Sequence, residues 1–370
     1  MAWLWQQKDW PTFSFDPSRY EVQEDVFYAN SGRVSGSIEH LELQQGEVFK
    51  IDVLCQEAVA TSVIEGELLD RDSVQSSIRR HMGLQTDHRR VSAAESGVAE
   101  MHVDLYSRYA EPLTHDMMHE WHAMLTNGRR DLTDIGRYRT HAEPMQIVSG
   151  SYSKPKVYYE APPSAMVQSE MDCYVEWFNT VVADKTTSVL GTAAIAHLYF
   201  EMIHPYEDGN GRIGRALVEK VLSTRLGGPS LNSFSRVIEL NKKRYYTALQ
   251  QCNTSSDVEK YVHFFIDMVL ASQDYTYAMV RLLIHKSKVL RKYNDVLNDR
   301  QVKLLLRLYD VAQEGFEGGV NAKKYTAITR ASASSATRDL QQLAELGVLY
   351  KTGQLKGTRY HLAGPDGLRL

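Results

Sequence analysis

The sequence predicts a mainly α-helical protein with one β-hairpin in its body and a smaller helix-and-hairpin module near its C-terminal end. Two observations lead to this fold class. Apolar residues recur at three- and four-residue spacings over most of the chain, which is the period of a helix face packed on a core. Short β-prone runs around turn residues occur in two places, near residues 145–159 and 347–362.

The composition is that of a globular protein. At 370 residues, with 43% hydrophobic and 24% charged residues, the chain is long enough for two or three cores. No apolar run approaches the length of a membrane span, and the first residues lack the pattern of a secretion signal, so we expect a cytoplasmic protein without membrane contact. Three scattered cysteines favour neither a disulfide framework nor a zinc site.

The charge is unevenly distributed along the chain. Residues 300–370 contain 11 Lys and Arg against 6 Asp and Glu, a balance of +5, so with a net charge of −4 the remaining residues carry −9. A basic module attached to an acidic body indicates a separate role for that end.

The N-terminal region combines an aromatic arm with helices. The arm contains Trp3, Trp5, Trp10, Phe13, Phe15 and Tyr20. Such a strip can bind a partner, but we favour an arm packed on its own domain. Helices are then predicted from Val34 to Lys50 and, by apolar spacing, from Ile51 to Met82.

Two amphipathic helices are predicted between Ala93 and Asn127, with a break near Pro112. The second carries His115, His119 and His122 at four- and three-residue spacing. This spacing can bind zinc, but no further ligand is indicated, and we favour a partly exposed helix face.

Residues 136–163 break the helical period. Met145–Val148 and Val157–Tyr159 are β-prone runs around residues 149–152, which predicts a hairpin. An exposed hairpin edge can hold an extended peptide by strand addition. A plain surface hairpin is the alternative.

The stretch HPYEDGNGRIGR, residues 204–215, lies between two predicted helices. The first helix covers residues 187–203 and stops at Pro205; the second starts near Asn210 and runs to Gly227. Glycines on both sides of Asn210 let the backbone approach a ligand, and the first amides of the second helix are unpaired. The sequence therefore predicts a phosphate site there.

The polar side chains of this loop suit phosphoryl or nucleotidyl transfer. Arg212 and Arg215 are three apart on the first helical turn, so both can clamp phosphate oxygens. Asp208 is a hard oxygen donor suited to a magnesium ion that bridges substrate phosphates. His204 can take a proton near neutral pH. A Gly-rich turn with a solvated charge cluster is the alternative, but it does not account for so many chemical groups within twelve residues.

This stretch resembles the signature of the Fic family, HxFx(D/E)GNGRxxR, at every polar position, with Tyr206 where the family usually has Phe. The resemblance covers roughly residues 50–270 and implies a Fic-fold helical bundle that transfers AMP from ATP to a protein hydroxyl. A phosphorylating sister branch has Lys at the position of Gly211, so this glycine favours nucleotide transfer. The added hydroxyl of Tyr206 must find a partner.

The resemblance also implies roles for the loop residues. His204 is the expected general base, and Asp208 is expected to hold Mg²⁺ beside the ATP. The phosphates are expected at Gly209, Asn210, Gly211, Arg212 and Arg215. Tyr246 and Asn253 are expected on the nucleobase side, where an aromatic ring stacks and an amide reads adenine, although two adjacent tyrosines on a helix are by themselves core packing.

Residues 61–66, TSVIEG, resemble the inhibitory motif (S/T)xxxE(G/N) of Fic proteins. Thr61 and Glu65 are four apart and share a helix face. In the family such a glutamate reaches the second arginine of the signature, here Arg215, and its upstream position implies an N-terminal inhibitory helix. A solvated carboxylate is the alternative for Glu65.

Two further segments fit the resemblance. The hairpin at about 145–159 follows the GxYR sequence of residues 136–139 and matches the target-binding flap, so a protein substrate is expected along it. Three helices and two strands predicted between Arg300 and Leu362 have the winged-helix order. With its charge of +5, the segment 300–370 is predicted either to bind DNA or to serve docking or homodimer formation.

The domains expected are an N-terminal domain with the inhibitory helix over 1–95, a Fic catalytic core over 96–275 and a winged-helix domain over 290–370. The expected activity is AMPylation of a target protein, with self-modification, autoinhibited by Glu65. Three alternatives stay open: an ATP-responsive winged-helix DNA-binding regulator, removal of AMP with Glu65 orienting a water, and transfer of UMP or GMP.

Overall fold

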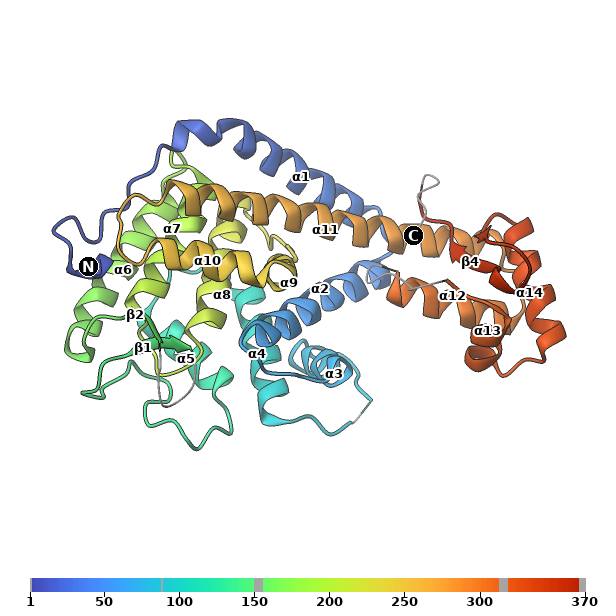
Figure 1. Cartoon of the computed structure of the whole chain (residues 1–370), viewed down its shortest axis with the longest axis horizontal. Coiled ribbons are helices and arrows are strands. Elements are labelled where there is room, and N and C mark those ends of the chain that lie inside the picture. Colours follow the sequence, from blue (N-terminus) through green and yellow to red (C-terminus); the bar gives the residue numbers. More distant parts are fainter. Residues whose placement is uncertain (1, 88, 150–155, 313–318, 366–370) are drawn as a thin grey trace. The chain divides into compact units, whose positions relative to one another are not determined.

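The structure, a computed structural model, describes residues 2–87, 89–149, 156–312 and 319–365. The chain divides into two compact units (Figure 1). The first contains Met1–Gly36 and Leu43–Thr276, and the second contains Ser37–Glu42 and Tyr277–Leu370.

Helices make up most of the first unit (Figure 1). Its elements, in chain order, are η1 (Leu4–Gln6), η2 (Pro17–Tyr20), α1 (Glu21–Glu39), α2 (Leu43–Ile64), α3 (Arg71–His81), α4 (Ala93–Arg108), α5 (His115–Leu125), β1 (Gln146–Ser149), β2 (Lys156–Glu160), α6 (Ser164–Ala183), α7 (Val189–Ile203), α8 (Asn210–Leu226), α9 (Phe234–Leu240), α10 (Lys242–Gln251) and α11 (Glu259–Lys292). Helices α1 and α11 contribute residues to both units.

Helix α7 is the centre of the first unit's core. Every residue from Val189 to Ile203 is buried, and α7 packs against α6 and α8. Gly214 permits the close approach of α8, since a Cβ there would lie 2.9 Å from a carboxylate oxygen of Glu201 on α7. The loop joining α7 to α8 is therefore held between two well-packed helices.

Local sequence signals set the ends of these two helices. Ser188 caps α7 by accepting a hydrogen bond from the Gly191 amide. Gly227 ends α8 in the left-handed conformation, at φ 71°. The predicted helices at 187–203 and from Asn210 to Gly227 are thus confirmed.

The upstream helices differ from the prediction at one place. The single helix predicted over Val34–Lys50 is wrong for residues 40–42, because α1 ends at Glu39 and α2 begins at Leu43. The helical pattern from Ile51 to Met82 is divided between α2 and α3. Gly66, at φ 87°, lies in this break.

The aromatic arm packs on its own unit, as expected. The indole Nε1 of Trp5 donates to the backbone oxygen of Glu160 at 2.8 Å, and that of Trp10 donates to a carboxylate oxygen of Glu170 at 2.8 Å. Tyr20 is buried in the core. The arm is thereby fixed beside the hairpin and α6.

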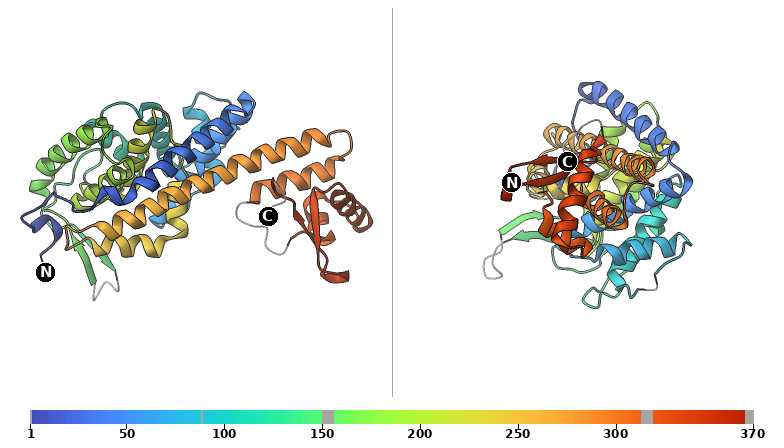
Figure 2. Two further views of the ribbon diagram at one scale, coloured as in Figure 1. Left: turned by 90° about the horizontal axis from the view of Figure 1, so that it is seen from above. Right: turned by 90° about the vertical axis from the view of Figure 1, so that its right-hand side faces the viewer.

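The predicted hairpin is present, and it projects from the first unit (Figure 2). Strands β1 and β2 are antiparallel, with Gln146 opposite Glu160. Tyr159 anchors the second strand, since its hydroxyl donates to the backbone oxygen of Met202 at 2.6 Å. Residues 150–155, which include most of the expected turn, lie outside the described part of the chain.

The second unit has a core of its own, to which α11 contributes together with α12 (Asp299–Val311), α13 (Ala322–Thr329), α14 (Ala333–Glu345), β3 (Leu349–Thr352) and β4 (Arg359–Leu362); η3 (Leu355–Gly357) lies between the two strands in the sequence. Strands β3 and β4 are antiparallel, and Val320 forms a bridge to Tyr360. This is the predicted order of three helices and a hairpin; a winged helix stays a prediction.

Two expectations from composition can be compared with the structure. Cys55, Cys173 and Cys252 are all free, and the first and last of them are buried. Among the helices in the described residues, none is both long and apolar enough to cross a membrane.

Candidate active site

The loop between α7 and α8 holds His204 in an unusual backbone conformation. The residue is left-handed, at φ 49° and ψ 61°, which costs about 1–3 kcal/mol for a residue with a side chain. Arg139, only 1% exposed, supports this conformation by donating from Nε to the His204 backbone oxygen at 2.8 Å and from Nη2 to that of Ile203 at 3.3 Å. Arg139 therefore stabilises the backbone conformation from which the His204 side chain projects.

The side chain of Asn210 closes the loop. Its Oδ1 accepts from the Tyr206 amide at 2.9 Å, and its Nδ2 donates to the Tyr206 backbone oxygen at 2.7 Å. Within the described residues no side chain caps the N-terminus of α8, where Gly209 has φ 83°. The predicted phosphate cradle thus consists of backbone N–H groups, and the Asn210 side chain maintains its shape.

The hydroxyl of Tyr206 finds the partner that the sequence analysis required. It lies 3.0 Å from Nδ1 of His119, and the ring stacks on His122 with centroids 4.2 Å apart. His122 also accepts from the Gly136 amide at 3.0 Å. His119 and His122 of α5 thus support the loop. The predicted partly exposed face is confirmed for His115 and His119, but it is wrong for His122, which is fully buried.

His204 is suited to accept a proton. Burial and the nearby charge of Arg139 lower the pKa of His204 to about 4, so the imidazole is neutral at pH 7. Glu201 lies on the preceding turn, with Oε2 3.8 Å from His204 Nδ1. Burial and the charge of Glu65 raise the pKa of Glu201 to about 8, so this carboxyl is protonated near neutral pH. Glu201 is not among the residues predicted from the sequence, although its three-residue spacing from His204 was a usable signal.

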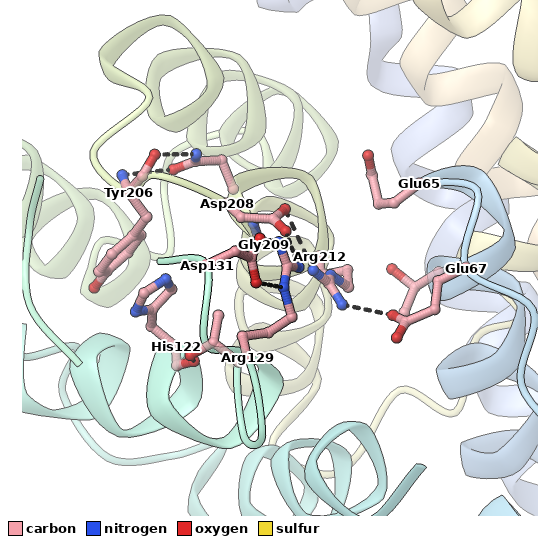
Figure 3. Close-up of polar contacts among 12 residues, drawn as sticks. Glu65, Glu67, His122, Arg129, Asp131, Tyr206, Asp208, Gly209 and Arg212 are labelled. Carbon is pink, nitrogen blue, oxygen red and sulfur yellow. Dashed lines mark hydrogen bonds and ion pairs between the residues drawn. The ribbon is translucent and has the colours of Figure 1, made fainter. Parts of the chain in front are cut away.

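Both arginines of the signature are paired with groups of residues 61–67. Arg215, 3% exposed, donates from Nη2 to Oε1 of Glu65 at 2.7 Å and from Nε to Oγ1 of Thr61 at 2.8 Å. Arg212 donates from Nη1 to Oε2 of Glu67 at 2.9 Å (Figure 3). The sequence placed Thr61 and Glu65 on one face, but nothing in it distinguished Glu67 from other acidic residues.

Gly211 allows the carboxylate to approach the helix. A Cβ at this position would collide with Oε1 of Glu65 and lie 3.1 Å from Nη1 of Arg215. The absence of a side chain at Gly211 is therefore a condition for the contact between Glu65 and Arg215.

Asp208 lies between two guanidinium groups (Figure 3). Its Oδ2 accepts from Nη1 of Arg129 at 2.5 Å, and its Oδ1 lies 3.4 Å from Nη2 of Arg212. Arg129 also donates from Nε and Nη2 to the two oxygens of Asp131, at 2.8 and 2.6 Å. Residues of alternating charge are thus paired in sequence from Glu67 through Arg212, Asp208 and Arg129 to Asp131.

The charges around Asp208 keep it ionised. Burial opposes ionisation, but Arg212 and Arg129 hold the pKa of Asp208 below its usual value. The described residues contain no group of three or more His, Cys, Asp or Glu arranged for a metal. A magnesium ion that keeps most of its waters and bridges phosphates needs only one or two carboxylates. Asp208, with its side chain 35% exposed and neutralised by cations, fits that role.

One cavity of about 670 Å³ is lined by five of the eleven predicted site residues. This volume is typical of a small-molecule site. Among the residues that line it are Glu65, Ile147, Val148, Tyr158, Glu201, His204, Gly211, Tyr246 and Asn253. Tyr246 is 43% exposed, whereas Tyr245 is 1% exposed and its hydroxyl lies 3.0 Å from Nε2 of His197. Asn253 donates from Nδ2 to the backbone oxygen of Tyr158 at 2.7 Å, which joins this side of the cavity to the hairpin.

Comparisons with known proteins find similarity to the Fic/DOC family and to protein adenylyltransferases. A model of the Fic/DOC family matches residues 112–222, and a model described as a domain of unknown function, DUF4172, matches residues 3–84. The chain is 31% identical over 100 residues to a probable protein adenylyltransferase of Aquifex aeolicus, covering 27% of this chain and 28% of that protein. It is 25% identical over 209 residues to the protein adenylyltransferase fic-1 of Caenorhabditis elegans, covering 55% of this chain and 37% of that protein.

A solved structure has a similar fold over nearly the whole chain. The crystal structure of a Fic family protein from Desulfovibrio desulfuricans aligns with a TM-score of 0.52 and 18% identity, over 97% of this chain and 99% of that one. The matched regions span about a third of the length of the two curated relatives.

Proposed function

We propose that this chain, whose residues 112–222 match the model of the Fic/DOC family, transfers AMP from Mg-ATP to a hydroxyl side chain of a target protein. The observation that supports this proposal best is the single cavity lined by His204, Gly211 at the N-terminal end of α8, and Asn253. The cavity combines a neutral base with an uncapped helix N-terminus that can bind phosphates.

In the proposed reaction the oxygen of the target hydroxyl attacks the α-phosphorus of ATP. The bond from that phosphorus to the oxygen bridging to the β-phosphate breaks, and pyrophosphate leaves. His204 takes the hydroxyl proton, and the N–H groups at the start of α8 stabilise the charge on the phosphate oxygens. A magnesium ion held at Asp208 supplies further neutralisation of the phosphates when bound.

The conformation described here corresponds to an inhibited state under this proposal. Nη2 of Arg215 is 2.7 Å from Glu65, and the same guanidinium is the group proposed to bind the γ-phosphate. Since it cannot serve both carboxylate and phosphate in one geometry, Glu65 misplaces the triphosphate. A displacement of about 1 Å at the α-phosphate can cost about 10²-fold in rate.

The hairpin is the proposed binding site of the target protein. In the described residues it is a two-stranded sheet, so a target segment in extended conformation can pair with a strand edge. Ile147 and Val148 are 41% and 50% exposed, and they also line the cavity. This arrangement brings a peptide held on the hairpin close to His204.

A labelling experiment tests the proposed reaction. The protein is incubated with a cell lysate and ATP labelled at the α- or the γ-phosphate, with and without magnesium, beside His204→Ala. We expect α-label on target proteins, and on the protein itself at 42.1 kDa, only with magnesium and His204. Label from the γ-phosphate that appears only when the protein is added, or α-label that is equally strong with His204→Ala, would overturn the proposal.

The alternatives are tested with the same site. Incubation with labelled UTP or GTP in place of ATP tests whether UMP or GMP is transferred instead of AMP. Release of AMP from a modified target, lost in Glu65→Gln, would favour the removal reaction instead.

A role for the second unit is a separate proposal. Exposed basic residues lie on and after α13 and on α14, and they are Lys323, Lys324, Arg330 and Arg338. We propose that this unit is a winged-helix module that binds DNA through this face. Docking or dimerisation through the same unit is the competing outcome of a binding test.

A further inference from the structure

We propose that Arg129 is an internal cation that competes with the divalent metal for Asp208 and thereby sets the metal concentration at which the site is filled. The inference deepens the proposed function and depends on it for the role of Asp208 as metal ligand. It concerns two residues, Arg129 and Asp131, that neither the signature nor the inhibitory motif contains.

The hydrogen bonds of Arg129 are divided unequally between its two carboxylates. One donor, Nη1, bonds to Asp208, whereas Nε and Nη2 form a bidentate pair with Asp131. A bidentate guanidinium–carboxylate pair is geometrically specific and strong. A metal ion arriving at Asp208 therefore has to replace one bond of Arg129, while Asp131 retains the other two.

Hydrogen bonds hold the backbone around Arg129 and along the segment that follows it. The Arg129 amide donates to the Thr126 backbone oxygen at 3.0 Å. Further along, the amides of Thr133 and Asp134 donate to Glu207 of the signature loop at 2.8 and 3.1 Å. The Arg129 side chain is 40% exposed, so it can leave Asp208 without crossing packed residues.

Arg129 is the closer of the two cations at Asp208. The Nη2 of Arg212 lies 3.4 Å from Oδ1, and its Nη1 is held by Glu67 at 2.9 Å. Competition for the metal at this carboxylate thus comes mainly from Arg129.

Direct metal binding tests the proposal without an activity assay. Mn²⁺ is titrated into the full-length protein with a fixed concentration of an α,β-methylene analogue of ATP, and free Mn²⁺ is followed by electron paramagnetic resonance. Arg129→Gln is expected to lower the half-saturating Mn²⁺ concentration by about three- to tenfold, the range of an ion pair that is partly exposed. Arg130→Gln is the matched control, because it removes an exposed charge from the next residue.

The role of Asp131 is tested by a double-mutant cycle. Asp131→Asn frees Arg129 from its bidentate partner, so Arg129 pairs more with Asp208 and the half-saturating Mn²⁺ concentration rises. In the Arg129→Gln background the same change is expected to have a smaller effect. Equal effects in both backgrounds would mean that Asp131 acts only through its charge and would overturn its part of the proposal.

Folding is checked for each variant by thermal unfolding. If Arg129→Gln does not fold, Arg129→Lys is used, since an ammonium cannot reproduce the fork between the two carboxylates; it is expected to lower the half-saturating concentration by a smaller factor. A shift no larger than that of Arg130→Gln overturns the proposal. Wild-type protein that binds the analogue without any Mn²⁺ dependence contradicts the metal role in the proposed function instead.

Discussion

Removing the charge of Glu65 is expected to destabilise the nucleotide-free protein. The Arg215 side chain is 2% exposed and that of Glu65 is 29% exposed, with 2.7 Å between Nη2 and Oε1. A charge-assisted hydrogen bond contributes about 1.5–3 kcal/mol. Because water reaches Glu65 and glutamine keeps an acceptor oxygen, Glu65→Gln should lower the free energy of unfolding by about 1–2 kcal/mol.

The same variant should bind ATP more tightly. Under the proposed function, the γ-phosphate takes its place on Arg215 only after Glu65 is displaced, and a weaker contact at Glu65 makes this displacement easier. The free energy of ATP binding should become more favourable by the amount that the contact between Glu65 and Arg215 loses. A loss of about 1–2 kcal/mol corresponds to a Kd for ATP that is lower by about five- to thirtyfold. Stability and affinity thus change in opposite directions.

The assay combines urea unfolding with calorimetric titration of Mg-ATP. Glu67→Gln serves as the control, because Glu67 pairs with Arg212 and its side chain is 38% exposed; we expect its effect on unfolding to stay below about 1 kcal/mol. A Glu65→Gln protein that loses stability but binds ATP no better would refute the idea that carboxylate and phosphate compete for Arg215.

Four further predictions follow from individual contacts. Burial raises the pKa of Glu57 from 4.5 to about 8, so the folded state keeps a proton that the unfolded state releases above about pH 4.5, and the free energy of unfolding should fall by about 1.4 kcal/mol per pH unit between about pH 4.5 and pH 8; Glu57→Gln should flatten this fall in urea unfolding. Tyr206→Phe loses one hydrogen bond and should lower the free energy of unfolding by about 1 kcal/mol; an unchanged midpoint of urea unfolding would contradict this. Arg139→Lys should reduce kcat about 10²-fold with an unchanged Kd for ATP, and equal losses in both would point to misfolding. The full-length protein should be retained on duplex DNA through residues 277–370, and this retention should weaken steeply as the salt concentration rises. An absence of retention at low salt would contradict the DNA proposal.

The sequence predicted those parts of the site that lie within one short stretch. The loop from His204 to Arg215 contains its chemistry in consecutive residues, so residue type and spacing were sufficient. The pairing of Arg215 with Thr61 and Glu65 was expected only from the family resemblance, and the structure has these contacts.

The rest of the site depends on contacts between distant segments, which spacing cannot show. Arg129 and Arg139 come from the segment after α5 and reach Asp208 and His204 only in the folded chain. Similarly, the break between α1 and α2 leaves no clear mark in the apolar pattern, because residues 34–50 contain few apolar side chains at a single spacing.

The most direct test of the central claim is the transfer of label from α-labelled ATP to protein by three forms: wild type, Glu65→Gln, and Glu65→Gln combined with His204→Ala. The account predicts weak labelling by the wild type, strong magnesium-dependent labelling by the single variant, and none by the double variant. Labelling that does not rise in Glu65→Gln, or that persists in the double variant, would contradict AMP transfer by His204 under the control of Glu65.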